Sequence, residues 1–141
     1  MTIEIHAQPA SMRHIVEKFH LKNSSAIVVG EVIFTSGFGA FDHATGMALP
    51  GEDIRAHANH AIDTYELVLG ELGYGLDQVV KVSAFLVHPE RDYVGWNEVF
   101  EKRFRAPHPC RTTVGAPLVA GIVELDFTLA RTSRVLVGDD T

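Results

Sequence analysis

The stretch PHPCRTTVGAPLVAGIVELDFTLAR, residues 107–131, predicts two neighbouring strands, 110–116 and 122–131, joined by a short connection that contains Pro and Gly. Along the second strand apolar and polar residues alternate. Because successive side chains of a strand point to opposite faces, this strand has one apolar face and one polar face. The apolar face carries Val123, Leu125, Phe127 and Leu129, and the other carries Glu124, Asp126 and Thr128.

The first strand contains an arginine, Arg111, which shares a face with Thr113. A guanidinium inside a β-branched run is costly to bury without an anionic partner. Either Glu124 or Asp126 on the neighbouring strand neutralises it, or a bound anion does. We favour the bound anion, with a carboxylate nearby in another role.

Composition sets the broad class. The 141 residues are 46% hydrophobic and 21% charged, which is typical of one globular domain, expected here over residues 1–141. A net charge of −6 without any run of Lys or Arg argues against nucleic acid as a partner. No apolar stretch approaches 18 residues and the first 14 residues lack the apolar core of a secretory signal, so we expect no membrane association. A single cysteine fits a reducing compartment, and we expect a cytoplasmic protein.

The remaining elements follow from hydrophobic periodicity. Residues 1–12 and 132–141 are expected to be loose ends, and residues 13–19 suit either a short strand or one turn of helix. The predicted regular elements are strands at 26–29 and 32–36, a helix at 52–72, a strand at 79–87, a helix at 89–104 and the two strands above. This β-β-α-β-α-β-β order predicts a two-layer α+β domain with two helices on one face of a mixed sheet.

The other face of that sheet is expected to be half polar and to be covered by a second copy of the chain. We place there Phe85 among the polar residues Thr35, Lys81, Ser83, Arg111, Thr113, Glu124 and Asp126.

A set of motifs in fixed order resembles the RidA/YjgF/YER057c/UK114 family, also labelled endoribonuclease L-PSP. The motifs are VIFTSG at 32–37, Asp42 with Thr45-Gly46, GYGLDQVVKV at 73–82, NEVF at 97–100, PCRTTV at 109–114 and VEL at 123–125. The resemblance implies a chorismate-mutase-like fold, a homotrimer with ligand clefts between subunits, and no cofactor. It also implies deamination of reactive enamine and imine intermediates.

The resemblance also implies roles for individual residues. Arg111 would bind the substrate carboxylate, for which a planar guanidinium is well suited, and Glu124 would position the hydrolytic water. The family positions that match Ser36, Gly37, Thr113 and Asn97 suggest further substrate contacts. Many members carry a Tyr where this chain has Asn23, and Phe38-Gly39-Ala40 replaces a commoner pattern. The wall on the substrate side is therefore expected to be altered.

Several alternatives stay open at this point. The protein could bind a small carboxylate metabolite without catalysis, and ribonuclease activity is a weaker possibility given the acidic charge. Cys110 is interpreted as a small core residue. His57, His60 and Asp63 share a helix face and could hold a metal, but we expect no metal site.

Overall fold

The computed structural model describes residues 2–132 and 135–138. An N-terminal strand β1 (Ile3–Ala7) leads through a short 3-10 helix η1 (Ala10–Met12) into helix α1 (Arg13–Phe19). The rest of the chain forms β2 (Ser24–Val29), β3 (Val32–Thr35), β4 (Phe38–Gly39), α2 (Ile54–Glu71), η2 (Leu76–Gln78), β5 (Val79–Leu86), α3 (Pro89–Arg103), β6 (Cys110–Gly115) and β7 (Val123–Ala130).

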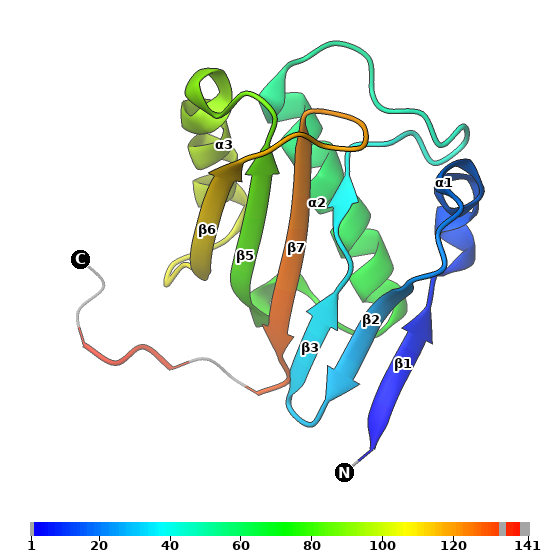
Figure 1. Cartoon of the computed structure of the whole chain (residues 1–141). Helices are drawn as coiled ribbons and strands as arrows, with labels where there is room; N and C mark the ends of the chain where they lie inside the picture. Colours follow the sequence, from blue (N-terminus) through cyan, green and yellow to red (C-terminus); the bar gives the residue numbers. More distant parts are fainter. Residues whose placement is uncertain (1, 133–134, 139–141) are drawn as a thin grey trace.

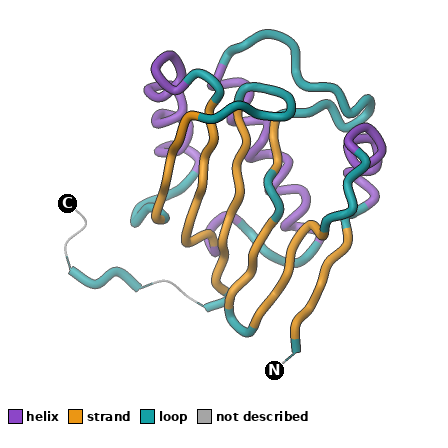
Figure 2. Tube along the Cα trace, in the orientation of Figure 1, coloured by secondary structure: helices purple, strands orange, loops and turns teal. Residues whose placement is uncertain are grey.

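Within the described residues the strands form one mixed sheet in the order β1-β2-β3-β7-β5-β6, with the short β4 paired to β7. Among the strands that the structure describes, only the β5–β6 pair is parallel, because α3 carries the chain back across the sheet between these two strands. Helices α2 and α3 lie side by side on one face (Figures 1 and 2). The predicted α+β fold with a mixed sheet is confirmed.

The prediction of a loose N-terminal end was wrong. Residues 3–7 form β1 at the edge of the sheet, where Ile3 pairs with Val29 and Ile5 with Ile27. Residues 13–19 form α1 rather than a strand, because Met12 and Ile15 are buried against the core. At the other end, residue 132 and residues 135–138 form neither helix nor strand, while residues 133–134 and 139–141 lie outside the described residues.

The alternation predicted for the last strand is confirmed, since its four apolar residues are all buried. The prediction for β5 needs one correction. The pairing with β7 shifts between Val79 and Lys81, so that Val79 faces the core and Val80 does not.

The face predicted for Arg111 was also wrong. Residues paired across neighbouring strands share a face of the sheet, and Arg111 pairs with the buried Val82 of β5. Glu124 pairs instead with Phe85. Arg111 therefore lies on the face covered by helices, and Glu124 lies on the open face.

Three other residues also lie on the face of the sheet opposite to the predicted one. Thr113 pairs with the buried Ala84 and joins Arg111 on the helix face. Thr35 also faces the helices, since its hydroxyl meets that of Tyr65 on α2 at 3.3 Å. Cys110, interpreted as a core residue, is exposed and pairs with Lys81.

The open face of the sheet is more apolar than predicted. The side chains of Ile3, Ile5, Val32, Phe34 and Val114 are between 38% and 66% exposed there. Four of these residues lie together on β1 and β3, whereas Val114 lies on β6 at the other edge of the sheet, beyond β7 and β5. The apolar side chains on β1 and β3 are therefore neighbours rather than scattered exposed residues.

Candidate functional site

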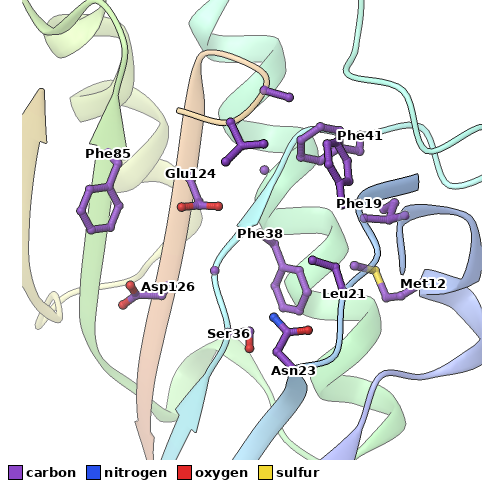
Figure 3. Close-up of a pocket in the computed structure, with 15 residues that line it drawn as sticks. Met12, Phe19, Leu21, Asn23, Ser36, Phe38, Phe41, Phe85, Glu124 and Asp126 are labelled. Atoms are coloured by element: carbon purple, nitrogen blue, oxygen red, sulfur yellow. The ribbon is translucent and has the colours of Figure 1, made fainter. Parts of the chain in front are cut away.

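A pocket of about 460 Å³ opens between β7 and the segment that contains α1 (Figure 3). Its floor comes from the point where the chain leaves β3 and crosses to β4, which pairs with β7. It is lined by Met12, Ile15, Phe19, Leu21, Asn23, Ser36, Gly37, Phe38, Gly39, Phe41, Phe85, Val119, Ala120, Glu124 and Asp126.

Glu124 supplies a carboxylate to this pocket from the open face of β7. Its side chain reaches solvent through the pocket, but the surrounding protein removes enough water to raise its pKa above the ordinary value. The nearby Asp126, on the same face two residues along, adds a smaller upward shift of the pKa by charge repulsion. A carboxylate with a raised pKa binds a proton more readily, which suits a group that exchanges protons with a substrate.

Gly37 leaves the space that the Glu124 carboxyl group occupies. A Cβ atom on residue 37 would lie 3.1 Å from Cδ of Glu124 and 3.3 Å from its Cγ. Any larger residue would therefore push the carboxyl group away from the loop. The glycine is explained by this close approach and not by an unusual backbone angle.

The buried hydroxyl of Tyr65 holds the loop at residues 36–37 against β7. It lies 2.7 Å from the carbonyl oxygen of Ser36 and also meets the carbonyl oxygen of Leu125, next to Glu124 in the chain. Burial raises the pKa of Tyr65 well above its ordinary value, so the hydroxyl stays protonated and can donate. Ser36 donates its own hydroxyl to the carbonyl of Ser24.

Asn23 stands at the rim of the pocket, where its side-chain oxygen accepts a hydrogen bond from Gln8 at 3.0 Å. An exposed amide replaces the aromatic ring that the resemblance leads one to expect. The aromatic side chains of the pocket come instead from Phe19, Phe38 and Phe41.

Arg111 lies outside this pocket, on α3's side of the sheet. Its guanidinium carbon is 4.8 Å from the ring centroid of Phe100, and its Nη2 donates to the hydroxyl of Tyr93 at 3.2 Å. Across the described residues, no carboxylate forms an ion pair with it. The hypothesis that Glu124 or Asp126 of the same subunit neutralises Arg111 is therefore wrong.

Two other predicted residues lie near Arg111. Thr113 accepts a hydrogen bond from Trp96 Nε1 at 3.1 Å, which ties β6 to α3. Asn97 follows Tyr93 by one helical turn and so lies toward the same side of α3. Of the predicted site residues, the fold thus gathers Asn23, Ser36, Gly37 and Glu124 in the pocket, and Arg111, Thr113 and Asn97 elsewhere.

The apolar residues that line the pocket were not predicted from the sequence. Met12, Ile15 and Phe19 follow one another at helical spacing, a signal that was available in the sequence. It was ambiguous because α1 is only seven residues long. Asp126, which was not among the predicted site residues, also lines the pocket.

The histidines do not form a metal centre in the described part of the chain, where no group of three His, Cys, Asp or Glu residues is placed to hold an ion. Asp63 is paired with Arg103 at 2.7 Å, and His57 is buried, with Nε2 3.4 Å from the carbonyl oxygen of Pro50. None of the helices among residues 2–132 and 135–138 has the length and apolar character that crossing a bilayer requires.

Comparison with known proteins places these features in context. The family model described as endoribonuclease L-PSP matches residues 20–128. A RutC family protein of Pyrococcus abyssi is 35% identical over 91 residues, which cover 64% of this chain and 70% of the relative. A protein of Dermatophagoides farinae named 2-iminobutanoate/2-iminopropanoate deaminase is 32% identical over 92 residues, covering 65% and 70%. The crystal structure of a RidA protein from an Antarctic Psychrobacter species superposes with a TM-score of 0.71 at 25% identity, covering 92% of this chain and 98% of the other.

Proposed function

The chain belongs to the RidA/YjgF family, and from that premise we propose that it hydrolyses reactive imine and enamine intermediates to keto acids and ammonia. The single observation that carries the proposal is the Glu124 carboxylate, with its raised pKa, inside a pocket large enough for a metabolite. A relative named as an imine deaminase supports the choice of reaction.

The chemistry needs little more than positioning and a proton relay. An enamine tautomerises to its imine, and the oxygen of a water molecule then bonds to the imine carbon while Glu124 takes a proton from that water. That proton passes to the imine nitrogen, which completes a tetrahedral carbinolamine. The proton of the new hydroxyl group is then relayed to the nitrogen, the C–N bond breaks as the C=O bond forms, and ammonia and the keto acid are released. Because imines hydrolyse readily in water, holding substrate and water together supplies much of the acceleration. The reaction as written requires no cofactor.

The acidic pocket needs a cation from elsewhere to hold a substrate carboxylate. Arg111 has the geometry for this role, since its guanidinium has no carboxylate partner among the described residues. Arg111 and Glu124 lie on opposite faces of one sheet, so one subunit cannot bring both to one small molecule. We therefore propose that Arg111 of one subunit completes the pocket of another, with Thr113 and Asn97 beside it.

The open face of the sheet supports assembly. Its exposed apolar side chains on β1, β3 and β6 would be covered if copies of the chain packed sheet to sheet. We propose a homotrimer, which light scattering would show as about three times the mass of the chain. A monomer in solution would remove the shared site.

The first test measures ammonia release from 2-aminoacrylate and 2-iminobutanoate generated in situ, with Arg111→Ala and Glu124→Gln beside the wild type. We expect both variants to lose the acceleration over the spontaneous reaction. If no acceleration is found but small carboxylates bind in an Arg111-dependent way, the protein is a binding module instead. Degradation of RNA with a dependence on Glu124 would support the ribonuclease alternative.

Mixed assemblies test whether the site is shared. When the two inactive variants are co-expressed, random assembly gives each inter-subunit site about a one-in-four chance of containing both wild-type residues. We expect about that share of activity to return. If every site lies within one subunit, no mixture of the two variants regains activity.

A further inference from the structure

We infer that the preferred substrates are imines and enamines of 2-amino acids with a bulky apolar side chain, such as an aromatic ring. The inference rests on the proposed hydrolysis at Glu124 and concerns the wall that faces this carboxylate. That wall consists of Met12, Ile15, Phe19, Leu21, Phe38 and Phe41, which we call the apolar wall (Figure 3).

The size of the pocket points to a large side chain. The pocket measures about 460 Å³, whereas a cavity of about 150 Å³ is enough to hold benzene. The methyl or ethyl group of a three- or four-carbon imino acid would leave the accessible part of the apolar wall, which comes from the partly buried Phe19, Leu21 and Phe41, in contact with water. A ring or a branched chain would cover it, and burial of that apolar surface would strengthen binding.

The pocket is polarised, so the orientation of the substrate follows. Glu124 and Asp126 lie on the β7 side, and the apolar wall lies across from them beside α1 (Figure 3). The C=N group must reach Glu124 for water to be activated there. The side chain of the substrate then extends toward the apolar wall. The carboxylate of the substrate points out of the pocket, whose described lining includes neither Lys nor Arg.

The apolar wall is held in place before any ligand binds. Phe19 and Phe41 contact each other edge to face with ring centroids 5.2 Å apart, and Phe38 packs against the buried ring of Tyr65 at 4.8 Å. The turn that follows Phe41 fits closely against α1, since a Cβ atom on Gly46 would lie 2.6 Å from the carbonyl oxygen of His14. A preformed wall binds a matching side chain without an ordering cost.

The charge of the pocket excludes other side chains. Two carboxylates in the same pocket repel an acidic side chain, and a basic side chain that extends toward the apolar wall would lose its water without gaining a partner. Apolar side chains are the class that the lining favours.

The test compares imines made in situ by an amino-acid oxidase from alanine, 2-aminobutyrate, leucine and phenylalanine. Hydrolysis is followed as a loss of the imine that semicarbazide would otherwise trap. One methylene in an apolar pocket changes kcat/KM by roughly 10- to 200-fold, so we expect at least a 10-fold preference for the phenylalanine imine over the alanine imine. If the small imines react as well or better, the inference is wrong while the proposed function stands. If no imine is hydrolysed faster than in buffer, the proposed function itself fails.

Two tryptophan variants locate the preference. Leu21→Trp fills the pocket from the apolar wall, and Leu67→Trp makes the same change at an exposed site on α2 outside it. Leu21→Trp should lower the ratio of kcat/KM for the phenylalanine imine to that for the alanine imine by at least about 10-fold. Leu67→Trp should leave this ratio unchanged. An equal effect of both variants, or an unchanged ratio in Leu21→Trp with a wild-type melting curve, would overturn the inference.

Discussion

The close approach of Gly37 to Glu124 gives a sharp test of the candidate site. In Gly37→Ala the new methyl carbon would lie 3.1 Å from Cδ of Glu124, whereas unstrained carbon atoms lie at about 3.5 Å or more. The carboxyl group must therefore retreat by about 0.4 Å, toward the open pocket. The backbone itself is not strained by the change, since Gly37 does not have a positive φ.

The size of the effect follows from this displacement. A misplacement of about 1 Å in an active site costs roughly 100-fold in rate, so a shift near 0.4 Å should lower kcat by about 3- to 10-fold. The free energy of unfolding should change by less than about 1 kcal/mol, because the carboxyl group has room to move and alanine restricts the unfolded chain. Gly37→Ala is thus expected to lower the activity of the protein while leaving its stability nearly unchanged.

The assay measures kcat for imine hydrolysis and the thermal unfolding of three glycine variants. Gly70→Ala is the control, because no other atom lies within 4 Å of the Cβ that this change adds. Gly39→Ala is the contrasting case, since its Cβ would lie 2.7 Å from the Phe41 ring and 3.0 Å from a backbone oxygen, and it should destabilise the protein by about 1–3 kcal/mol. Full kcat in Gly37→Ala, or a loss no larger than the loss of folded protein, would refute the role given to this contact.

Three further changes test the surroundings of the site. Tyr65→Phe removes a buried hydroxyl and should lower the free energy of unfolding by about 1–3 kcal/mol in urea titrations. The control Tyr74→Phe removes a hydroxyl that contacts an exposed arginine and should change the free energy of unfolding by less than about 0.5 kcal/mol. Equal losses in the two variants would contradict this prediction. Burial and the neighbouring His43 lower the pKa of His60 below 6.5, so the unfolded chain binds protons first as the pH falls and the free energy of unfolding decreases. His60→Gln should flatten this decrease between pH 7.5 and 5.5, and an unchanged slope of the free energy of unfolding against pH would count against the pKa shift. Because Asp126 raises the pKa of Glu124, Asp126→Asn should move the acidic limb of kcat/KM to lower pH, and a limb that stays in place or moves upward would exclude this coupling.

The pattern of the sequence predicted most of the sheet and its covering helices, because the strands and helices of the core repeat their apolar residues regularly. It failed at the N-terminus for a physical reason. A seven-residue helix such as α1 has little stability alone and exists because Met12 and Ile15 are buried in the tertiary structure. An edge strand such as β1 pairs on one side only, so its sequence carries a weaker signal.

The candidate site was likewise predicted only in part. The motifs identified Ser36, Gly37 and Glu124, which the fold does bring together in one pocket. They did not identify the apolar wall, because its residues come from η1, α1, β4 and the segments beside them, and no single stretch of sequence shows that they meet.

The sequence by itself determined that Arg111 and Thr113 point to one side of their strand, because side chains alternate along any strand. Which side that is depended on the tertiary structure alone. The parallel register of β6 on β5 sets Arg111 beside the buried Val82, under α3, and the antiparallel register of β7 sets Glu124 on the open face. Alternation is a local property of the backbone, whereas register is set by how distant segments pack, and this is why the two charged groups lie on opposite faces of the sheet.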